Sequence, residues 1–126
     1  MCISPDQIRT AGLVPPVFVY SHDSDPMISG SPQVIIGGYV YRGTAISDLQ
    51  GWYLFCDGYS GGCGALQVSG GGTSAAAHSL PCLSGRLRTF TSFGQDNAGE
   101  LYVVGYTTDA ILAGPNAGIV LRIIGG

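Results

Sequence analysis

The chain has 126 residues, which is enough for one domain of modest size. Five arginines, no lysine and eight acidic residues give a net charge of −3, and only 10% of the residues are charged, against about a quarter in an ordinary soluble domain. This composition excludes a basic nucleic-acid-binding protein and a charged coiled coil. A mean hydropathy of +0.30 excludes disorder caused by low hydrophobicity.

Membrane and export signals are absent from the sequence pattern. No apolar run approaches the roughly 20 residues of a membrane-spanning helix, so we expect no membrane span. The first residues, Met1 to Asp6, have neither the basic nor the apolar region of a signal peptide, so we expect none within this chain.

Short β-branched and aromatic runs, separated by Gly, Pro, Asp and Ser, predict an all-β fold. In chain order, the strands are expected at residues 16–20, 34–41, 52–56, 64–68, 77–82, 88–93, 100–106 and 118–124. The longest helical candidate, Ser74 to His78, is an alanine run of only five residues.

The spacing of these strands predicts two similar antiparallel units. Leu54 and Val103 are 49 positions apart, and Leu66 and Leu121 are 55 apart. Antiparallel units that repeat every 50 or so residues are typical of β-propeller blades. A meander sandwich gives similar strand spacing and remains the alternative.

Four cysteines are present, Cys2, Cys56, Cys63 and Cys82. They form no C-x-x-C pair, which disfavours a zinc knuckle. Low charge and 21 glycines are typical of an extracellular β protein, where disulfides persist, and buried thiols are the alternative. Cys63 and Cys82 are mirror positions about Gly72-Thr73, and Cys56 and Cys63 about Tyr59-Ser60, so a hairpin could face either pair. Three connectivities are possible for four cysteines, and the sequence leaves the choice open.

Three segments carry a resemblance to a known family. Residues 37–43 and 49–61 resemble the motif G-G-Y-V-Y-R-G followed by L-x-G-x-Y-x-F-G-D-x-x-S-G. Residues 92–104 resemble S-F-G-E-D-x-x-G-E-L-Y-V-V, and residues 117–123 resemble a closing G-x-V-Y-R-I strand. In this order the motifs are those of the glucose/sorbosone dehydrogenase family, which includes hedgehog-interacting-protein-like proteins and soluble pyrroloquinoline-quinone (PQQ) sugar dehydrogenases.

The resemblance implies a position within a six-bladed β-propeller. The chain matches the C-terminal portion of the family fold, about two four-stranded antiparallel blades. Residues 1–33 would form a lead-in strand and loop, residues 34–84 one blade, and residues 85–126 the last blade. Two blades leave apolar flanks open, so we expect the rest of a propeller or further copies as partners, in a closed ring or a filament.

The same resemblance implies a cofactor contact. Arg86 and Arg88 are similar to an R-x-R pair that contacts PQQ in those enzymes, and strand alternation would place both on one face. A solvated basic turn is the alternative for this pair. The family's base histidine and cofactor lysine have no counterpart, since His22 and His78 match no such motif and Tyr59 stands near the lysine position. We therefore expect no catalytic residue in this chain.

Two departures weaken the match to a working enzyme. Cys56 replaces the glycine of F-G-D, and the Arg and aromatic residue after S-G are missing at residues 62–64. The resemblance implies oxidation of a sugar or alcohol as the parent activity, which the chain alone would lack. A secreted structural or interaction module that assembles through its open edges is the alternative.

Other candidate residues have structural alternatives. Tyr39, Tyr41, Trp52 and Tyr53 could stack on a carbohydrate, but strand alternation makes at least half of them packing residues. Residues 96–99 are expected to form a β-turn rather than a calcium loop, with Gly99 at positive φ. Residues 41–43 are expected to form a structural corner, and we predict no metal-ligating residue.

Overall fold

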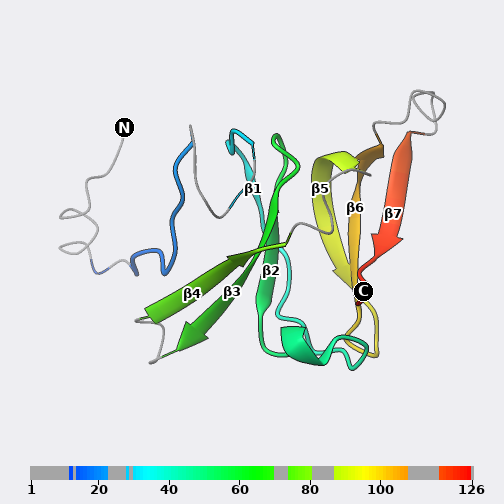
Figure 1. Cartoon of the computed structure of the whole chain (residues 1–126), viewed down its shortest axis with the longest axis horizontal. Coiled ribbons are helices and arrows are strands. Elements are labelled where there is room, and N and C mark those ends of the chain that lie inside the picture. The colour runs from blue at the N-terminus through cyan, green and yellow to red at the C-terminus, as the bar shows by residue number, and fades with distance from the viewer. Residues whose placement is uncertain are drawn as a thin grey trace.

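Two antiparallel sheets lie side by side in the computed structural model (Figure 1). The structure describes residues 12, 14–22, 28, 30–69, 74–80, 87–107 and 117–125. The first sheet has the strand order β1-β2-β3-β4 and the second β5-β6-β7. The strands are β1 (Ile35–Ile36), β2 (Tyr53–Asp57), β3 (Cys63–Ser69), β4 (Ser74–Ser79), β5 (Leu87–Gln95), β6 (Leu101–Thr107) and β7 (Gly118–Arg122).

The all-β, antiparallel prediction is therefore confirmed. The only helical element among these residues is the 3₁₀ turn η1 (Ser47–Leu49). Within the described part of the chain, the second sheet has three strands where the family resemblance implies four, and the two sheets do not close into a ring or barrel.

The first sheet begins with an interrupted strand. The sequence predicts one strand over residues 34–41, whereas β1 covers two residues and pairing resumes with an isolated bridge between Val40 and Tyr53. Gly38 lies at the break, where an added Cβ would collide with the carbonyl oxygen of Leu54. The glycine thus allows the backbone of this segment to press against β2.

The alanine run forms a strand and not a helix. It is β4, which pairs along its whole length with β3, from Gly64 opposite Ser79 to Ser69 opposite Ser74. Five residues are too few to nucleate a stable helix, and pairing with β3 satisfies the backbone groups instead.

A disulfide joins β2 to β3. Cys56 and Cys63 are directly opposite in the register, and their sulfur atoms are bonded. The alternative of Cys63 facing Cys82 is wrong in register, because β4 places Leu80 beside Cys63, with the Leu80 N–H donating to the Cys63 carbonyl at 2.8 Å. Cys2 and Cys82 lie outside the described residues.

The two sheets repeat one pattern of pairing. Leu54 faces Ala65 in the first sheet, as Val103 faces Leu121 in the second. The two predicted spacings do not fit these registers together, because a shift of 49 residues takes Leu54 to Val103 but the pairing then places Ala65, and not Leu66, at the position of Leu121.

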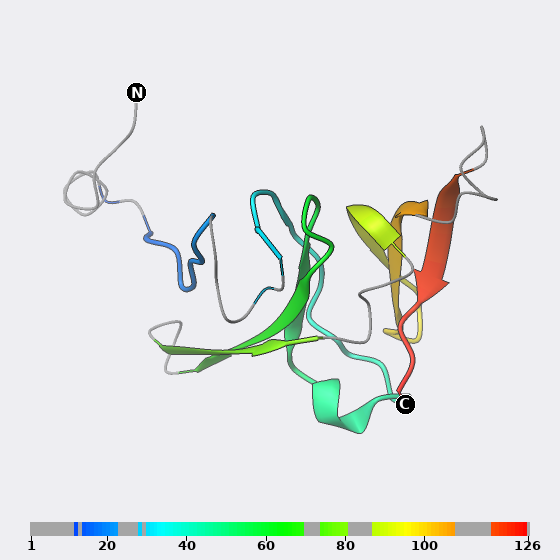
Figure 2. The same ribbon diagram turned by 45° about the horizontal axis from the view of Figure 1, so that its top comes forward.

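The main core consists of side chains from both sheets, whose ribbons lie side by side in Figure 2. Both sheets contribute to it: its members include Leu54 and Ala65 from the first sheet, and Phe90, Leu101 and Val103 from the second. Burial of these apolar side chains is the main force that holds the sheets together.

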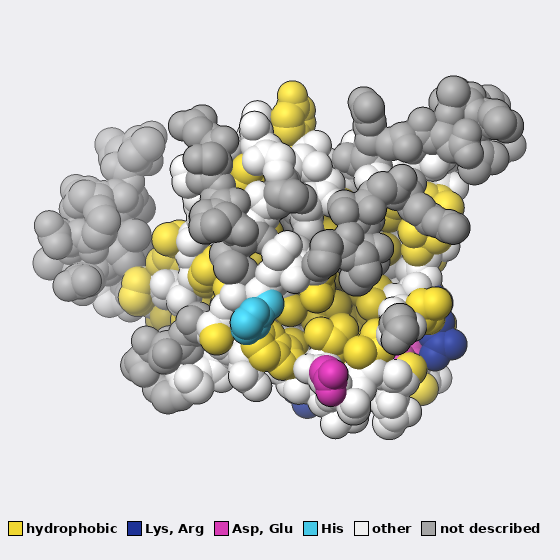
Figure 3. Space-filling model, viewed as in Figure 1, with side chains coloured by type: hydrophobic (Ala, Val, Ile, Leu, Met, Phe, Trp, Pro, Cys, Tyr) yellow, Lys and Arg dark blue, Asp and Glu magenta, His cyan; other side chains and the backbone are white. Residues whose placement is uncertain are grey.

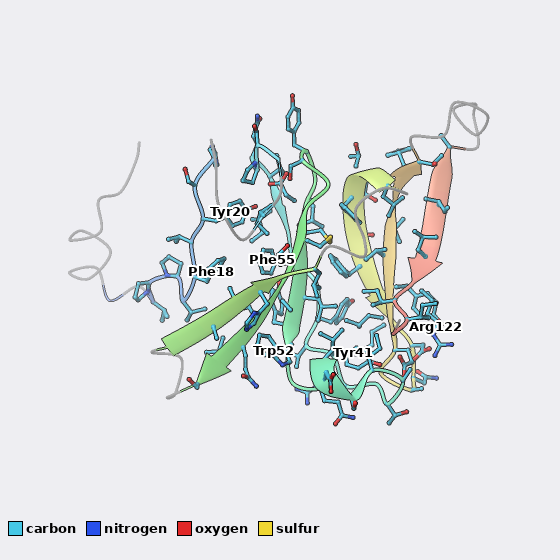
Figure 4. The ribbon with its side chains drawn as sticks, in the orientation of Figure 1. Phe18, Tyr20, Tyr41, Trp52, Phe55 and Arg122 are labelled. Carbon is cyan, nitrogen blue, oxygen red and sulfur yellow. A yellow bond between two sulfur atoms is a disulfide. The ribbon has the colours of Figure 1, made fainter. Side chains whose placement is uncertain are left out.

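The lead-in covers the other face of the first sheet. Residues 16–20 are predicted as a strand but make no ladder, because they pack through side chains: Phe18 and Tyr20 lie over Phe55, with ring centroids 6.0 and 6.3 Å away (Figure 4). Phe55, Leu66 and Ile28 form a second buried cluster there. The lead-in therefore shields one of the two flanks that the sequence predicts to be open.

Candidate functional site

The predicted cofactor contact falls at the edge of the described structure. Arg86 lies outside the described residues, and Arg88 belongs to β5, but its side chain is not described. The register of β5 is irregular here, between Leu87 and Thr89. The PQQ contact of this pair therefore stays a prediction.

The residues of the family-like motifs meet at a buried carboxylate. Glu100, which precedes β6, is 3% exposed and lies under the segment that follows Tyr41. Its Oε2 accepts a 2.8 Å hydrogen bond from the Tyr41 hydroxyl, and its Oε1 accepts the N–H groups of Thr44 and Ala45 at 2.9 and 3.0 Å. One carboxylate thereby ties the second sheet to the first.

The same contacts set the protonation of both partners. The hydrogen bond from the Tyr41 hydroxyl, followed by that from the Ala45 N–H, holds the pKa of Glu100 below its usual value. Burial, followed by the bond to the Glu100 carboxylate, raises the pKa of Tyr41. Tyr41 thus remains a hydrogen-bond donor to an ionised Glu100 at neutral pH.

Two glycines make room for this junction. A Cβ on Gly43 would lie 2.5 Å from Glu100 Oε1 and 2.7 Å from the Tyr41 hydroxyl, and one on Gly99 would meet the backbone of Arg42 at 2.7 Å. Arg122 lies at its edge, with a nitrogen 3.8 Å from Glu100 Oε2 (Figure 4). Tyr41, Arg42 and Gly43 accordingly form a corner of the fold, as the sequence predicts.

A second buried carboxylate, Asp57, organises the hairpin between β2 and β3. It is 0% exposed. Oδ1 accepts the N–H groups of Tyr59 and Ser60 at 2.9 and 2.7 Å. Oδ2 accepts those of Gln33 and Val34 at 2.7 and 2.8 Å, together with the Tyr20 hydroxyl at 3.1 Å. Asp57 thus fixes the hairpin and the lead-in at once.

These donors decide the charge of Asp57. Burial alone would raise the pKa of this carboxyl, but the backbone N–H groups of Ser60, Val34, Tyr59 and Gln33 outweigh burial and hold the pKa below its usual value. With its lone pairs engaged in this way, the carboxylate is placed for structure and not for proton transfer.

Cys56 and Cys63 lie where the sequence departs from the motifs that it resembles. Cys56 stands in the place of a glycine, and Cys63 lies within residues 62–64, where an Arg and an aromatic residue are missing. They are the partners of the disulfide, beside Asp57. A covalent bond therefore closes the hairpin at this place.

The turn at residues 96–99 has the predicted form. Asp96 Oδ1 accepts the N–H groups of Ala98 and Glu100, both at 2.9 Å, and Gly99 has a φ of 82°. Among the described residues, no group of three or more His, Cys, Asp and Glu side chains could hold a metal ion.

The candidate carbohydrate-stacking aromatics divide between packing and surface. Tyr41 is buried, and the hydroxyl of the half-buried Tyr53 accepts the Gly38 N–H at 3.0 Å. Tyr39 is 42% exposed. Trp52 is half-buried and lies edge-on to His78, with ring centroids 5.1 Å apart.

The described surface has hollows, and histidines help to line two of them. One of about 240 Å³ lies along the lead-in and includes His22 and Ile35 in its lining. The other, of about 180 Å³, includes Trp52 and His78. His22 and His78 thus each line a hollow, although sequence reasoning assigned no role to either residue.

A scan against known protein-family profiles finds no match for this chain. No helix among the described residues has the length and apolar character to cross a membrane.

Sequence reasoning missed the structural roles of Glu100 and Asp57. A signal for both was present, since each acid lies at one end of a run of apolar residues, Glu100 before Leu101 and Asp57 after Cys56. An acidic side chain that is buried beside such a run is almost always hydrogen-bonded. Burial of either acid would therefore have predicted hydrogen-bond partners inside the fold.

Proposed function

We propose that this chain supplies two neighbouring blades of a β-propeller that resembles the glucose/sorbosone dehydrogenases, and that it functions within a ring completed by further blades. The observation that carries the proposal is the junction at Glu100. Tyr41 and Glu100 belong to two separate motifs of the resemblance, and they are hydrogen-bonded at 2.8 Å between the facing sheets.

The arrangement of the sheets supports the same proposal. Consecutive antiparallel sheets that pack face to face, each built from sequential strands, are the arrangement of neighbouring propeller blades. The outer face of the second sheet presents Tyr106 and Val120, which are 55% and 61% exposed. A further blade would cover these side chains.

The parent activity, PQQ-dependent oxidation of a sugar or other alcohol, would belong to the completed ring. The quinone would carry the redox chemistry, while the protein would supply binding and orientation. Arg86 and Arg88 are the residues that the resemblance offers for this purpose. The isolated chain is expected to be inactive.

A second candidate function is a secreted interaction module that builds a ring or filament from its own copies. The apolar outer face of the second sheet favours it, because a head-to-tail contact between unlike faces propagates or closes. The disulfide between Cys56 and Cys63 is consistent with an extracellular location, where such bonds persist.

Native mass spectrometry and size-exclusion chromatography with light scattering test the blade proposal. We expect the purified chain to associate through the outer face of the second sheet, and Tyr106→Gln with Val120→Gln to reduce this association. The matched control is Tyr59→Gln, since Tyr59 is 65% exposed but lies in the β2–β3 hairpin. A stable monomer with a native circular dichroism spectrum would overturn the proposal.

The activity assay is separate from the assembly assay. PQQ, Ca²⁺, an aldose and a dye acceptor are added to the isolated chain, and no turnover is expected. Dye reduction that depends on both PQQ and the aldose would show that the chain alone is an enzyme.

A further inference from the structure

The second sheet has a free edge along β7. It has three strands where the first sheet has four, and β7 is its outermost strand. The N–H of Ile123, directly after β7, donates to the Leu101 carbonyl at 2.9 Å, so the odd-numbered residues of β7 bond to β6. In an antiparallel ladder the residues between them point their backbone groups to the other edge. These residues are Gly118, Val120 and Arg122. Among the described residues, no strand pairs with this edge.

The lead-in at residues 16–20 also has unpaired backbone. No described residue makes a backbone hydrogen bond with Phe18 or Val19. The rings of Phe18 and Tyr20 hold the segment on Phe55. Because side chains alternate along an extended segment, Val19 points away from Phe55, and it is 72% exposed. The lead-in therefore offers backbone groups and an apolar side chain that the described part of this chain does not cover.

The two unpaired features lie at opposite ends of the molecule. In both Figure 1 and Figure 2, the lead-in lies beyond the first sheet and β7 lies at the far side of the second. Figure 3 shows apolar side chains at the surface of both ends. The lead-in of one molecule therefore cannot reach its own β7, but it can reach the β7 of a second copy stacked beside it.

We propose that the lead-in of one copy pairs with the free edge of β7 in a second copy and completes the second sheet of that copy as its fourth strand. Strand addition to an open edge uses backbone groups in the plane of the sheet, whereas side chains project from its faces. Phe18 and Tyr20 can therefore keep their contacts with Phe55 while the backbone of the lead-in pairs.

The faces of the two strands agree with this arrangement. Ile119 and Leu121 pack against the main core, so Val120 lies on the outer face of the second sheet, where it is 61% exposed. That outer face would pack on the first sheet of the second copy, where Phe18 lies. Val19, on the other side of the lead-in, would extend the inner face beside Ile119. Both exposed valines would then be covered by apolar neighbours.

The competing occupant of the edge is β7 of another copy. Two identical edges can pair in a closed dimer. Such a dimer would leave Val19 and the flank around the lead-in exposed in both copies, and so would a strand from an unrelated protein. The lead-in covers both unpaired features with one contact. This inference rests on the second candidate function, assembly of copies of this chain, and names the contact that holds them.

A proline in β7 tests the edge. Val120→Pro removes an N–H that points away from β6, so the ladder with β6 stays intact, as prolines on edge strands allow. We expect the dissociation constant of the assembly, measured by size-exclusion chromatography with light scattering, to rise about 10-fold more than in Val120→Ala. Val120→Ala is the matched control because it shortens the same side chain and keeps the N–H.

A charge on the lead-in tests the other side of the contact. Val19→Asp places a carboxylate where the proposal covers an apolar side chain, and we expect it to raise the dissociation constant about 10-fold or more. Val14→Asp adds the same charge at a side chain that is 90% exposed and lies before the pairing segment, so it should leave the association unchanged. Because Val19 is exposed in the single molecule, the circular dichroism spectrum of each variant should stay native.

A mixture of the two impaired variants gives the sharpest test. Val120→Pro keeps an intact lead-in, and Val19→Asp keeps an intact β7 edge. One good contact can therefore form between them, although neither variant associates well alone. Native mass spectrometry of an equimolar mixture is expected to show heterodimers that do not grow further.

Each other outcome has a definite meaning. A monomeric original chain would overturn the blade proposal together with this inference. Association of the original chain that survives both Val120→Pro and Val19→Asp would overturn the inference alone. Loss of association in Val120→Pro but not in Val19→Asp, with no heterodimer in the mixture, would reject the lead-in and identify pairing of β7 with β7.

Discussion

The Tyr41 hydroxyl donates a 2.8 Å hydrogen bond to Glu100 Oε2 across 59 positions of sequence. The same hydroxyl accepts the N–H of Ile46 at 3.0 Å, so it both donates and accepts inside the fold. Glu100 in turn accepts two backbone N–H groups of the first sheet's loop. Apolar contacts hold the two sheets together but have little directional preference. The hydrogen bonds of this junction are directional, so they fix the orientation of one sheet relative to the other.

Removal of that hydroxyl should therefore cost stability. Tyr41→Phe keeps the buried ring but deletes the donor to a carboxylate and leaves the Ile46 N–H without its acceptor. We expect the free energy of unfolding to fall by about 2 kcal/mol, measured by urea denaturation. Tyr59→Phe, at a ring that is 65% exposed, is the control and should change it by less than about 0.5 kcal/mol. Equal stability of the two variants would contradict a role for the junction.

Gly43 is expected to tolerate no side chain. In Gly43→Ala the new Cβ would lie 2.5 Å from Glu100 Oε1, so the carboxylate would have to leave its bonds to Thr44 and Ala45. We expect a loss of about 1–3 kcal/mol, typical of overpacking. Gly94→Ala is the matched control, because nothing lies within 4 Å of its added Cβ. Thermal denaturation of both variants decides the point, and an unchanged midpoint for Gly43→Ala would disprove the steric argument.

Local features of this fold could be predicted from the sequence. The strands β2, β3, β6 and β7 were expected within a few residues, since alternation and turn residues are local signals. The turn that ends at Gly99 was also expected, because it needs only an Asp side chain and a glycine at positive φ. The pairing of Cys56 with Cys63 was one of two alternatives, and the register of β4 excluded the other.

Features that depend on distant partners could not be predicted. The lead-in residues Phe18 and Tyr20 have the composition of a strand, but Phe55 holds them by their rings without a ladder. The registers of the two sheets do not allow both predicted repeat spacings at once, because apolar spacing alone does not fix strand pairing. The junction at Glu100 joins loops 55 to 59 positions apart, and no local pattern encodes such a contact.

The disulfide should stabilise the hairpin to a modest extent. Cys56 and Cys63 are separated by seven positions, and closing a loop of this size raises the free energy of the unfolded chain by only about 2.5 kcal/mol, through lost conformational entropy. Cys56→Ser with Cys63→Ser is expected to unfold at a lower urea concentration but with the same slope. The control is the original chain in reducing agent, which should match the double variant. A larger loss in the variant than on reduction would point to packing of the sulfur atoms rather than to the cross-link.

The stability of the fold should fall at acid pH. The pKa values of Asp57, Glu100 and Asp96 all lie below their usual values in the folded chain. The unfolded chain therefore binds protons more readily, and the free energy of unfolding decreases as pH falls below the ordinary carboxyl pKa of about 4. Above that pH these three groups contribute fully. At the other extreme, the raised pKa of Tyr41 makes the fold lose stability as pH rises above about 10.

The variant Asp57→Asn measures how much Asp57 alone contributes to the loss of stability at acid pH. In asparagine an NH₂ group replaces one of the two carboxylate oxygens. This NH₂ group donates and cannot accept, so it would lie against two backbone N–H donors, either those of the hairpin or those of the lead-in. We expect a loss of about 2–4 kcal/mol at pH 7 and a shallower fall in stability between pH 5 and pH 2, because a titrating group is gone. Asp48→Asn, at an exposed carboxyl that accepts the Ser47 hydroxyl at 3.3 Å, is the control and should leave the stability at pH 7 unchanged. Urea denaturation across this pH range measures the effect, and parallel curves for Asp57→Asn and the original chain would refute the assignment of the acid response to Asp57.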